Sequence, residues 1–231
     1  MSNGDLLKKC QRFNMIKSKL QKKNRYNDIV CLDKYSININ GYDSKNILSY
    51  IRANQMINKY GDEKERKIIM CQTPIQTTVD DMYDMIFRYK IGIIVILVNV
   101  NEIKVQNKCY PYFPADVKDM KTSRYTVLYI DKKVDEVNHI IEYDYTIYNN
   151  KNVASNFKLL YYISWPDKSI PNESKTIHKL YKKIINLYND RYIAIHCSAG
   201  IGRTGTLALA IFMIDMINSG KLFGDSSNAS L

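Results

Sequence analysis

A short run of residues near the end of the chain combines side chains that could bind an anion and attack it. It reads His196-Cys197-Ser198-Ala199-Gly200-Ile201-Gly202-Arg203-Thr204-Gly205. Small residues and glycines allow successive backbone N–H groups to turn toward one point, and a helix beginning at Arg203 directs its positive end there. The same amides would stabilise a thiolate, so the pKa of Cys197 is predicted to be lowered. We therefore predict that Cys197 is a nucleophile at neutral pH.

The neighbours of Cys197 suit the handling of a phosphate. Arg203, six positions further on, can fold back and bind two phosphate oxygens with its planar guanidinium. The Thr204 hydroxyl can donate a hydrogen bond to the sulfur and help it act as a leaving group when its bond to phosphorus breaks. His196 is predicted to orient the site rather than to transfer protons. The anion-binding backbone is predicted to come from Ser198, Ala199, Gly200, Ile201 and Gly202. The alternative, a buried structural cysteine at the end of a strand, would not require the glycines, the arginine and the helix start together.

The elements around this loop predict an α/β fold. An apolar face spaced for a helix covers residues 173–188, a short apolar strand covers 192–195, and a second helix covers 203–218. Further strands are predicted over 47–57, 67–71, 91–100, 126–130, 140–148 and 157–163, with a helix from Thr77 or Thr78 to Tyr89 and another helix from Ser2 to about Leu20. The order strand, loop, helix places the loop at the carboxyl end of a strand in a mixed sheet.

Composition indicates one globular domain. The chain has 231 residues, of which 45% are hydrophobic, enough for a single buried core. We predict one domain over residues 1–220 and a disordered tail over 221–231, where Gly, Ser and Asn are abundant. No stretch reaches the length of a transmembrane helix and no secretory signal is visible, so a cytoplasmic protein is predicted.

Cysteine usage and charge narrow the chemistry further. Five cysteines are scattered without close pairs, which predicts neither a disulfide framework nor a metal site. The net charge of +11 favours anionic partners but does not choose among them. No metal and no organic cofactor are expected.

Taken together, residues 196–205 resemble the signature of protein tyrosine phosphatases at every signature position. The segment Trp165-Pro166-Asp167 is similar to the mobile acid loop of that family, which implies that Asp167 protonates the leaving oxygen and then activates water, with Trp165 at the substrate site. Lys168 and Ser169 stand where the family commonly has an aromatic residue or His, and glycine. This difference predicts altered loop closure.

An earlier segment, Lys23-Asn24-Arg25-Tyr26-Asn27-Asp28, resembles the substrate-recognition loop of the same family. The resemblance implies that Tyr26 stacks on a phosphotyrosine ring and that Asp28 orients the peptide backbone. A deep slot of this kind admits phosphotyrosine and excludes the shorter phosphoserine. The segments Tyr50–Asn54, Gln72–Pro74 and Lys108-Cys109 occur in the family's order and are interpreted as structural.

The family implies a central twisted mixed sheet flanked by helices, here without the last C-terminal helices and the glutamine loop that positions water. Phosphocysteine formation is therefore predicted to survive while its hydrolysis slows. The wealth of Asn, Lys and Ile is similar to that of tyrosine phosphatase-like proteins of bracoviruses, non-receptor proteins that act inside host immune cells.

Three functions remain open from the sequence. The first is a phosphatase acting on phosphotyrosine-containing proteins through a phosphocysteine intermediate. The second is a phosphotyrosine-binding pseudophosphatase that captures substrates without releasing phosphate. The third, a phosphatase for RNA ends or lipid headgroups, suits the basic charge, but Tyr26 in its Lys-Asn-Arg context argues against it, so no nucleic-acid partner is expected.

Overall fold

The computed structural model describes residues 8–10, 22–39, 47–60, 64–104, 108–115, 119–171 and 174–220. The tail predicted over 221–231 lies outside these residues, as does the helix predicted over residues 2–20 except for residues 8–10.

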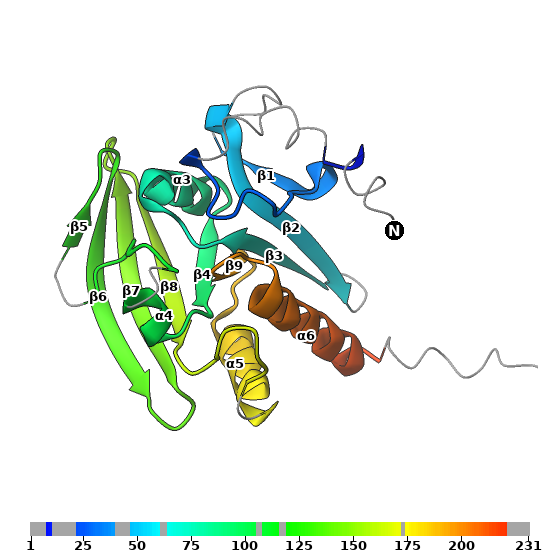
Figure 1. Cartoon of the computed structure of the whole chain (residues 1–231). Coiled ribbons are helices and arrows are strands. Elements are labelled where there is room, and N and C mark those ends of the chain that lie inside the picture. The colour runs from blue at the N-terminus through cyan, green and yellow to red at the C-terminus, as the bar shows by residue number, and fades with distance from the viewer. Residues whose placement is uncertain are drawn as a thin grey trace, which may run out of the picture.

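The described residues form one twisted sheet of nine strands in the order β1-β2-β3-β9-β4-β8-β7-β6-β5 (Figure 1). Its strands are β1 Ser36–Asn38, β2 Tyr50–Tyr60, β3 Lys64–Gln72, β4 Ile91–Ile96, β5 Asp119–Lys121, β6 Tyr125–Asp135, β7 Ile140–Asn149, β8 Ala154–Tyr162 and β9 Tyr192–Cys197. The four central strands, β3, β9, β4 and β8, are parallel, and the strands on either side are antiparallel. The predicted mixed sheet is confirmed, and the strands of the middle third, β5 to β8, pair with one another in antiparallel fashion.

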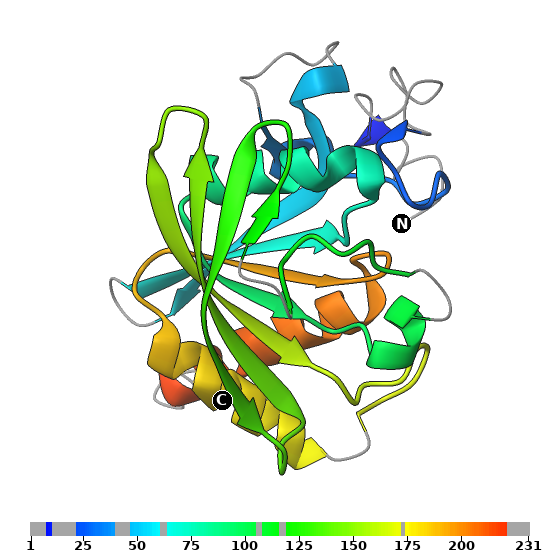
Figure 2. The same ribbon diagram turned by 90° about the vertical axis from the view of Figure 1, so that its left-hand side faces the viewer.

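The two strands at the centre of the sheet, β4 and β9, are mostly apolar, as is usual where helices cover both faces of a sheet. Every residue of β4 is buried, as are all of β9 except its first residue. Helix α3 lies on one face, and α5 and α6 lie together on the other (Figures 1 and 2). The helical segments are η2 Asp33–Tyr35, η3 Ile47–Ser49, η4 Gln76–Thr78, α3 Val79–Arg88, α4 Val100–Lys104, α5 Ser174–Leu187 and α6 Gly202–Asn218.

One predicted strand is too long. The apolar run predicted a strand over 91–100, but β4 ends at Ile96 and the short helix α4 begins at Val100. Asn99 and Glu102 explain the turn, because each accepts a hydrogen bond at its side chain from the backbone N–H of the other, at 3.0 Å in both cases. This reciprocal capping starts a helix at the end of an apolar run. It also fixes Glu102 at the carboxyl edge of the sheet.

Helix α6 is apolar nearly all round and is held by one buried carboxylate. Asp215 accepts hydrogen bonds from Arg66 Nε at 2.8 Å and Nη2 at 3.0 Å, from Asn58 Nδ2 at 3.2 Å and from the Tyr181 hydroxyl at 2.9 Å. These partners come from β2, β3 and α5, so four elements meet at one side chain. On its outer side, α6 exposes Leu209, Met213 and Ile217, one helical turn apart.

We expect Asp215→Ala to lower the free energy of unfolding by about 3–5 kcal/mol, because it leaves the Arg66 guanidinium buried without its partner. Urea-induced unfolding followed by Trp165 fluorescence measures the change. Asp131→Ala, at an exposed position of strand β6, is the control, expected to change stability by less than about 0.5 kcal/mol. Equal small effects of both substitutions would contradict the role given to Asp215.

Candidate active site

Strand β9 delivers Cys197 to the carboxyl edge of the sheet. The strand is two residues longer than predicted and pairs through Cys197 with Gln72 of β3, so the loop proper covers residues 198–201 before α6 begins at Gly202. The backbone N–H of Gly200 donates to Cys197 Sγ over 3.3 Å. A loop amide thus faces the sulfur, in the arrangement that would stabilise a thiolate.

Gly200 permits this loop to pack closely against the neighbouring strand. Its φ is +75°, and a Cβ atom added there would lie 2.2 Å from the carbonyl oxygen of Cys71. Both the left-handed backbone and the close approach require glycine. Gly202 and Gly205, in contrast, have open space where a Cβ atom would stand.

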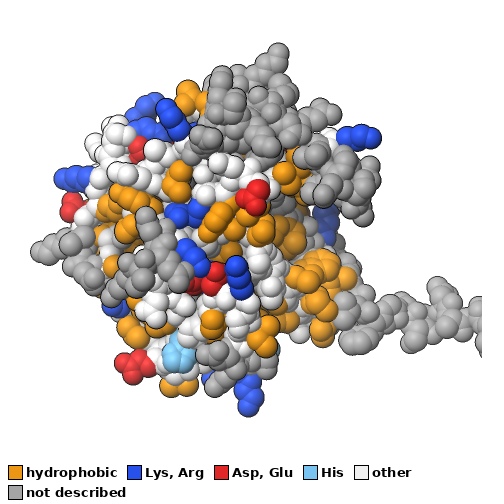
Figure 3. Space-filling model, in the orientation of Figure 1, with side chains coloured by type: hydrophobic (Ala, Val, Ile, Leu, Met, Phe, Trp, Pro, Cys, Tyr) orange, Lys and Arg blue, Asp and Glu red, His pale blue; other side chains and the backbone are white. Residues whose placement is uncertain are grey.

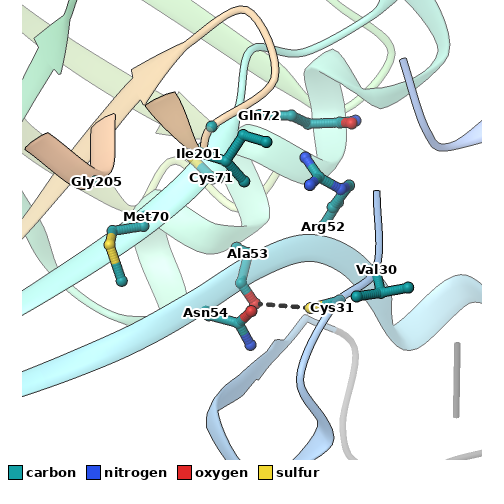
Figure 4. Close-up of a pocket in the computed structure, with 11 residues that line it drawn as sticks. Val30, Cys31, Arg52, Ala53, Asn54, Met70, Cys71, Gln72, Ile201 and Gly205 are labelled. Carbon is teal, nitrogen blue, oxygen red and sulfur yellow. Dashed lines mark hydrogen bonds between the residues drawn. The ribbon is translucent and has the colours of Figure 1, made fainter. Parts of the chain in front are cut away.

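Strand β2 and the residue that follows β3 hold the outside of the loop. Arg52 of β2 donates from Nη1 to the carbonyl oxygen of Ala199 and from Nε to that of Ile29 over 3.1 Å. The N–H of Thr73 donates to the carbonyl oxygen of Ser198 over 3.2 Å. A pocket of about 190 Å³ lies behind the loop, and Arg52 and Ile201 are among the residues that line it (Figure 4). The loop carbonyls are therefore bonded away from the anion-binding side.

Arg203 is buried and aimed by a carboxylate that the sequence analysis missed. Its Nη1 and Nη2 donate to the two oxygens of Glu102 over 2.6 and 2.8 Å, and Nη1 also donates to the carbonyl oxygen of Trp165 over 3.1 Å. This bidentate geometry fixes the plane of the guanidinium. The spacing Asn99-x-x-Glu102 was the available signal, because it marks a helix start immediately after a buried strand.

Asp167 lies against the same arginine. Its Oδ1 accepts from Arg203 Nη2 over 3.2 Å and its Oδ2 accepts from Lys108 Nζ over 2.6 Å. Partial burial alone would raise the pKa of this carboxyl, but the hydrogen bond from Lys108 and the charges of Arg203 and Lys108 outweigh it and lower the pKa. Figure 3 shows basic and acidic side chains gathered on the surface between α4 and α6. Lys108, interpreted from sequence as structural, is thus part of the site.

Trp165 supports the acid loop from beneath. Its side chain is buried, and Nε1 donates to the carbonyl oxygen of Ser169 over 2.9 Å. The indole is not among the residues that line the pocket over Cys197. Trp165 was predicted to lie at the substrate site, whereas its contacts in the structure support Arg203 and the turn that carries Asp167.

The recognition segment lines the same pocket as Asp167 and Cys197. A pocket of about 440 Å³ is lined by Tyr26 and Ile29 on one side, by residues 167–169 on the other, and by residues 197–199, 201–203 and 206 at its base. The hydroxyl of Tyr26 lies 3.0 Å from Ser198 Oγ. Asp28 is exposed and lies outside the lining. Tyr26 therefore reaches the site, while Asp28 stands on the surface beside it.

Gln72 and Pro74 anchor this recognition segment to the sheet. The backbone N–H of Arg25 donates to Gln72 Oε1 over 3.0 Å, and Gln72 Nε2 donates to the carbonyl oxygen of Lys23 over 2.7 Å. Arg25 Nη2 also donates to the carbonyl oxygen of Pro74 over 3.0 Å. The position of Tyr26 is therefore set by the end of β3, the strand next to β9.

His196 is buried and neutral. Its Nε2 lies 2.6 Å from the Tyr112 hydroxyl and its Nδ1 lies 3.3 Å from the carbonyl oxygen of Cys197. These contacts fit a ring that accepts at Nε2 and donates at Nδ1. Burial lowers the pKa of His196 to about 4. The orienting role of His196 stays a prediction, and a buried ring bonded to the Cys197 carbonyl oxygen is suited to it.

Thr204 does not make the contact predicted for it. Its side chain is fully buried at the start of α6, and Oγ1 has no hydrogen-bond partner among the described residues, the sulfur of Cys197 included.

Two other cysteines lie near the site without the same surroundings. Burial raises the pKa of Cys71 to about 12 and that of Cys109 to about 11. The Cys109 sulfur packs 2.8 Å from Thr73 Oγ1 in the core. Neither side chain lines the pocket that contains Asp167. Of these thiols, Cys197 alone lies among groups that could bind and transfer a phosphate.

The fold and the site define an α/β protein in which a cysteine at the end of β9 and an arginine in the first turn of α6 lie on either side of one short loop. The sequence model of the family described as protein-tyrosine phosphatase matches residues 20–226. This chain belongs to the protein-tyrosine phosphatase family. Among the described residues, no helix has the length and apolar character needed to cross a bilayer.

Individual relatives agree with this assignment. The chain is 32% identical over 195 residues to receptor-type tyrosine-protein phosphatase C of Rattus norvegicus, covering 82% of this chain and 15% of that protein. It is 31% identical over 203 residues to tyrosine-protein phosphatase 69D of Drosophila melanogaster, covering 84% and 14%. The crystal structure of the Trypanosoma brucei phosphatase TbPTP1 superposes with a TM-score of 0.75 at 26% identity, covering 89% of this chain and 70% of that one. The chain thus spans about one seventh of the two curated relatives.

We expect Gly200→Ala to lower the free energy of unfolding by about 2–4 kcal/mol, through left-handed strain and the clash with Cys71. Gly205→Ala, in an open helical position, should instead raise it by up to about 1 kcal/mol. Urea-induced unfolding measures both changes.

Inorganic phosphate should protect Cys197 from alkylation by iodoacetamide in the wild type and in Gly205→Ala. This protection should be lost in Gly200→Ala. Retained protection there would contradict the requirement for glycine.

A pH dependence of stability follows from His196. Below its usual pKa of 6.5 the unfolded chain binds a proton that the folded chain accepts only near pH 4. Unfolding therefore takes up a proton in this window, and the free energy of unfolding should fall by about 3 kcal/mol as the pH decreases from 6.5 to 4. His196→Gln should lack this component. Parallel pH profiles of the two proteins in urea titrations would show that His196 contributes none of it.

Proposed function

We propose that the chain hydrolyses phosphotyrosine in proteins through a phosphocysteine intermediate. The observation that carries this proposal is the meeting of Cys197, Arg203 and Asp167 in one pocket with an aromatic wall at Tyr26. A volume of about 440 Å³ suits a phenyl phosphate. The chain covers a small part of its receptor-type relatives, so the activity is proposed for this domain by itself.

In the first step, the Cys197 thiolate attacks phosphorus and the bond from phosphorus to the tyrosine oxygen breaks. The loop amides and the Arg203 guanidinium bind the non-bridging oxygens, where charge is concentrated in the transition state. Glu102 holds two donors of Arg203, so the guanidinium is oriented before substrate arrives. Binding therefore requires little rearrangement of the cation.

The leaving phenolate needs a proton, which Asp167 supplies. In the ligand-free chain this carboxyl is ionised and bonded to Arg203 and Lys108. A dianionic phosphate takes the place of Asp167 on Arg203 and brings negative charge beside the carboxyl, and both changes raise its pKa. The bound substrate thus favours the protonated carboxyl that donates to the leaving oxygen.

In the second step, water attacks phosphorus, the sulfur–phosphorus bond breaks, and the ionised Asp167 accepts the proton from water. Phosphate and the Cys197 thiolate are restored.

One observation favours a second candidate, capture of phosphotyrosine proteins without efficient release of phosphate. The buried Thr204 hydroxyl makes no hydrogen bond to Cys197. A donor to sulfur would stabilise the thiolate as it leaves phosphorus in the second step. Without it, phosphocysteine would form faster than it breaks down, and the site would act as a trap.

Composition supports a narrower biological setting. The abundance of Lys, Asn, Ile and Tyr, including 19 tyrosines, is in keeping with tyrosine phosphatase-like proteins of bracoviruses, which are of the non-receptor class. In that setting the domain acts in the cytoplasm of host immune cells and interferes with phosphotyrosine signalling.

Rapid-quench hydrolysis of a phosphotyrosyl peptide, with mass spectrometry of the quenched protein, tests the proposal. We expect steady turnover that is lost in Cys197→Ser and falls by about 10²- to 10⁴-fold in Asp167→Asn, which lacks the acid. Cys109→Ala, altered at a core thiol, should keep turnover.

A single burst that leaves phosphate on Cys197 would favour the trap over the phosphatase. Tight peptide binding with neither burst nor turnover would exclude both transfer steps. Hydrolysis of RNA ends or lipid phosphates with none of the peptide would overturn the choice of substrate.

A further inference from the structure

Lys168 stands in an unusual conformation at the edge of the pocket. Its φ is +54°, in the left-handed region that costs a residue with a side chain about 1 kcal/mol or more. The bond from Trp165 Nε1 to the Ser169 carbonyl oxygen closes the turn around it, and the Lys168 N–H donates to the Asp167 carboxylate. Strained residues of this kind persist where neighbouring contacts hold them, often at binding sites.

The charge of Lys168 is available to a ligand. Its side chain is exposed and lines the pocket beside Asp167 and Tyr26. The other charged residues of that lining, Asp167 and Arg203, are paired with each other, and Arg203 is also paired with Glu102. Within the described parts of the chain, Lys168 makes no ion pair of its own. An anion entering the mouth of the pocket would therefore meet an unpaired cation.

We propose that Lys168 is a specificity-determining residue that binds the carboxylate of an acidic residue next to phosphotyrosine in the substrate. The inference rests on the proposed function and names the substrates within it. The phosphate occupies the base of the pocket at Arg203, so a group at the mouth must come from a flanking residue of the peptide. The flexible stem of lysine allows its ammonium to follow such a residue.

The position of Lys168 also couples recognition to chemistry. It follows Asp167 directly, in the same turn, so a carboxylate bound to Lys168 helps to hold the acid over the leaving oxygen. A merely attractive surface charge would change KM alone. The contact proposed here changes kcat as well, because it favours the arrangement in which Asp167 reaches the phenolate.

Pairs of phosphotyrosyl peptides that differ only by Glu or Gln at one flanking position test the proposal. We expect the wild-type chain to prefer at least one Glu peptide in kcat/KM. Lys168→Met should reduce that preference about threefold and Lys168→Glu should reverse it, whereas Lys168→Arg should keep it. The preference should also shrink in 0.5 M salt, where charges at the surface are screened.

Lys90 offers a matched control. It is an exposed lysine with φ +48°, in the turn between α3 and β4, and it does not line this pocket. Lys90→Met should leave the Glu-to-Gln ratio unchanged.

Equal ratios in the wild type and Lys168→Met would overturn the proposal while leaving the phosphatase intact. If no peptide is hydrolysed, the proposed function fails. The affinities of the same peptide pairs are then compared for two proteins, Cys197→Ser and the double variant Cys197→Ser, Lys168→Met. A Glu preference lost with Lys168 supports the recognition role, and an unchanged affinity ratio contradicts it.

Discussion

The pairing of Arg203 with Glu102 fixes the guanidinium at the edge of the sheet where we propose that phosphate binds. Both side chains are buried, and their two short hydrogen bonds offset the cost of removing two charges from water. The pair can form only if the end of β4 and the start of α6 meet at one edge of the sheet. The order β9-β4 in the sheet brings them together, and the capped helix α4 turns Glu102 toward the arginine.

The rest of the fold supports the two ends of this pair. Asp215 ties the far part of α6 to β2, β3 and α5, so the helix that carries Arg203 cannot tilt without breaking a buried network. Arg52 and Gly200 hold the loop against β2 and β3 from the other side. A rigid cradle lies beside an acid loop that has more exposure, and this contrast suits a site in which one wall moves.

The sequence predicted what is encoded in contiguous residues. Cys197, Arg203 and the glycines between them lie on a strand, loop and helix whose patterns are local, so their order and the α/β class could be inferred without a structure. Tyr26 and Asp167 required the family resemblance, because nothing in their own neighbourhoods indicates that they share a pocket. Their placement depends on contacts with distant strands.

Other parts of the site could not be inferred because they depend on tertiary contacts. Glu102 follows an apolar run that predicted a longer strand, and only the contact with Arg203 reveals its role. The family resemblance of the segment that contains Trp165 implied a place at the substrate site, whereas burial in the core decides its position. Thr204 lies next to the arginine, yet rotation around α6 leaves its hydroxyl without the sulfur contact. Sequence spacing predicts which residue carries a functional group, whereas side-chain packing decides where that functional group points.

The contacts that build the site join residues far apart along the chain. Tyr26 and Ser198 are separated by 172 positions, Arg52 and Ala199 by 147, and Glu102 and Arg203 by 101. Contacts of such long range form slowly, and synthesis proceeds from the N-terminus. On the ribosome, the recognition segment, β2 and α4 must wait for the strand that completes the centre of the sheet. A chain synthesised only as far as β8 thus lacks Cys197 and Arg203, and the cysteine acquires its surroundings only after β9 and α6 have been made.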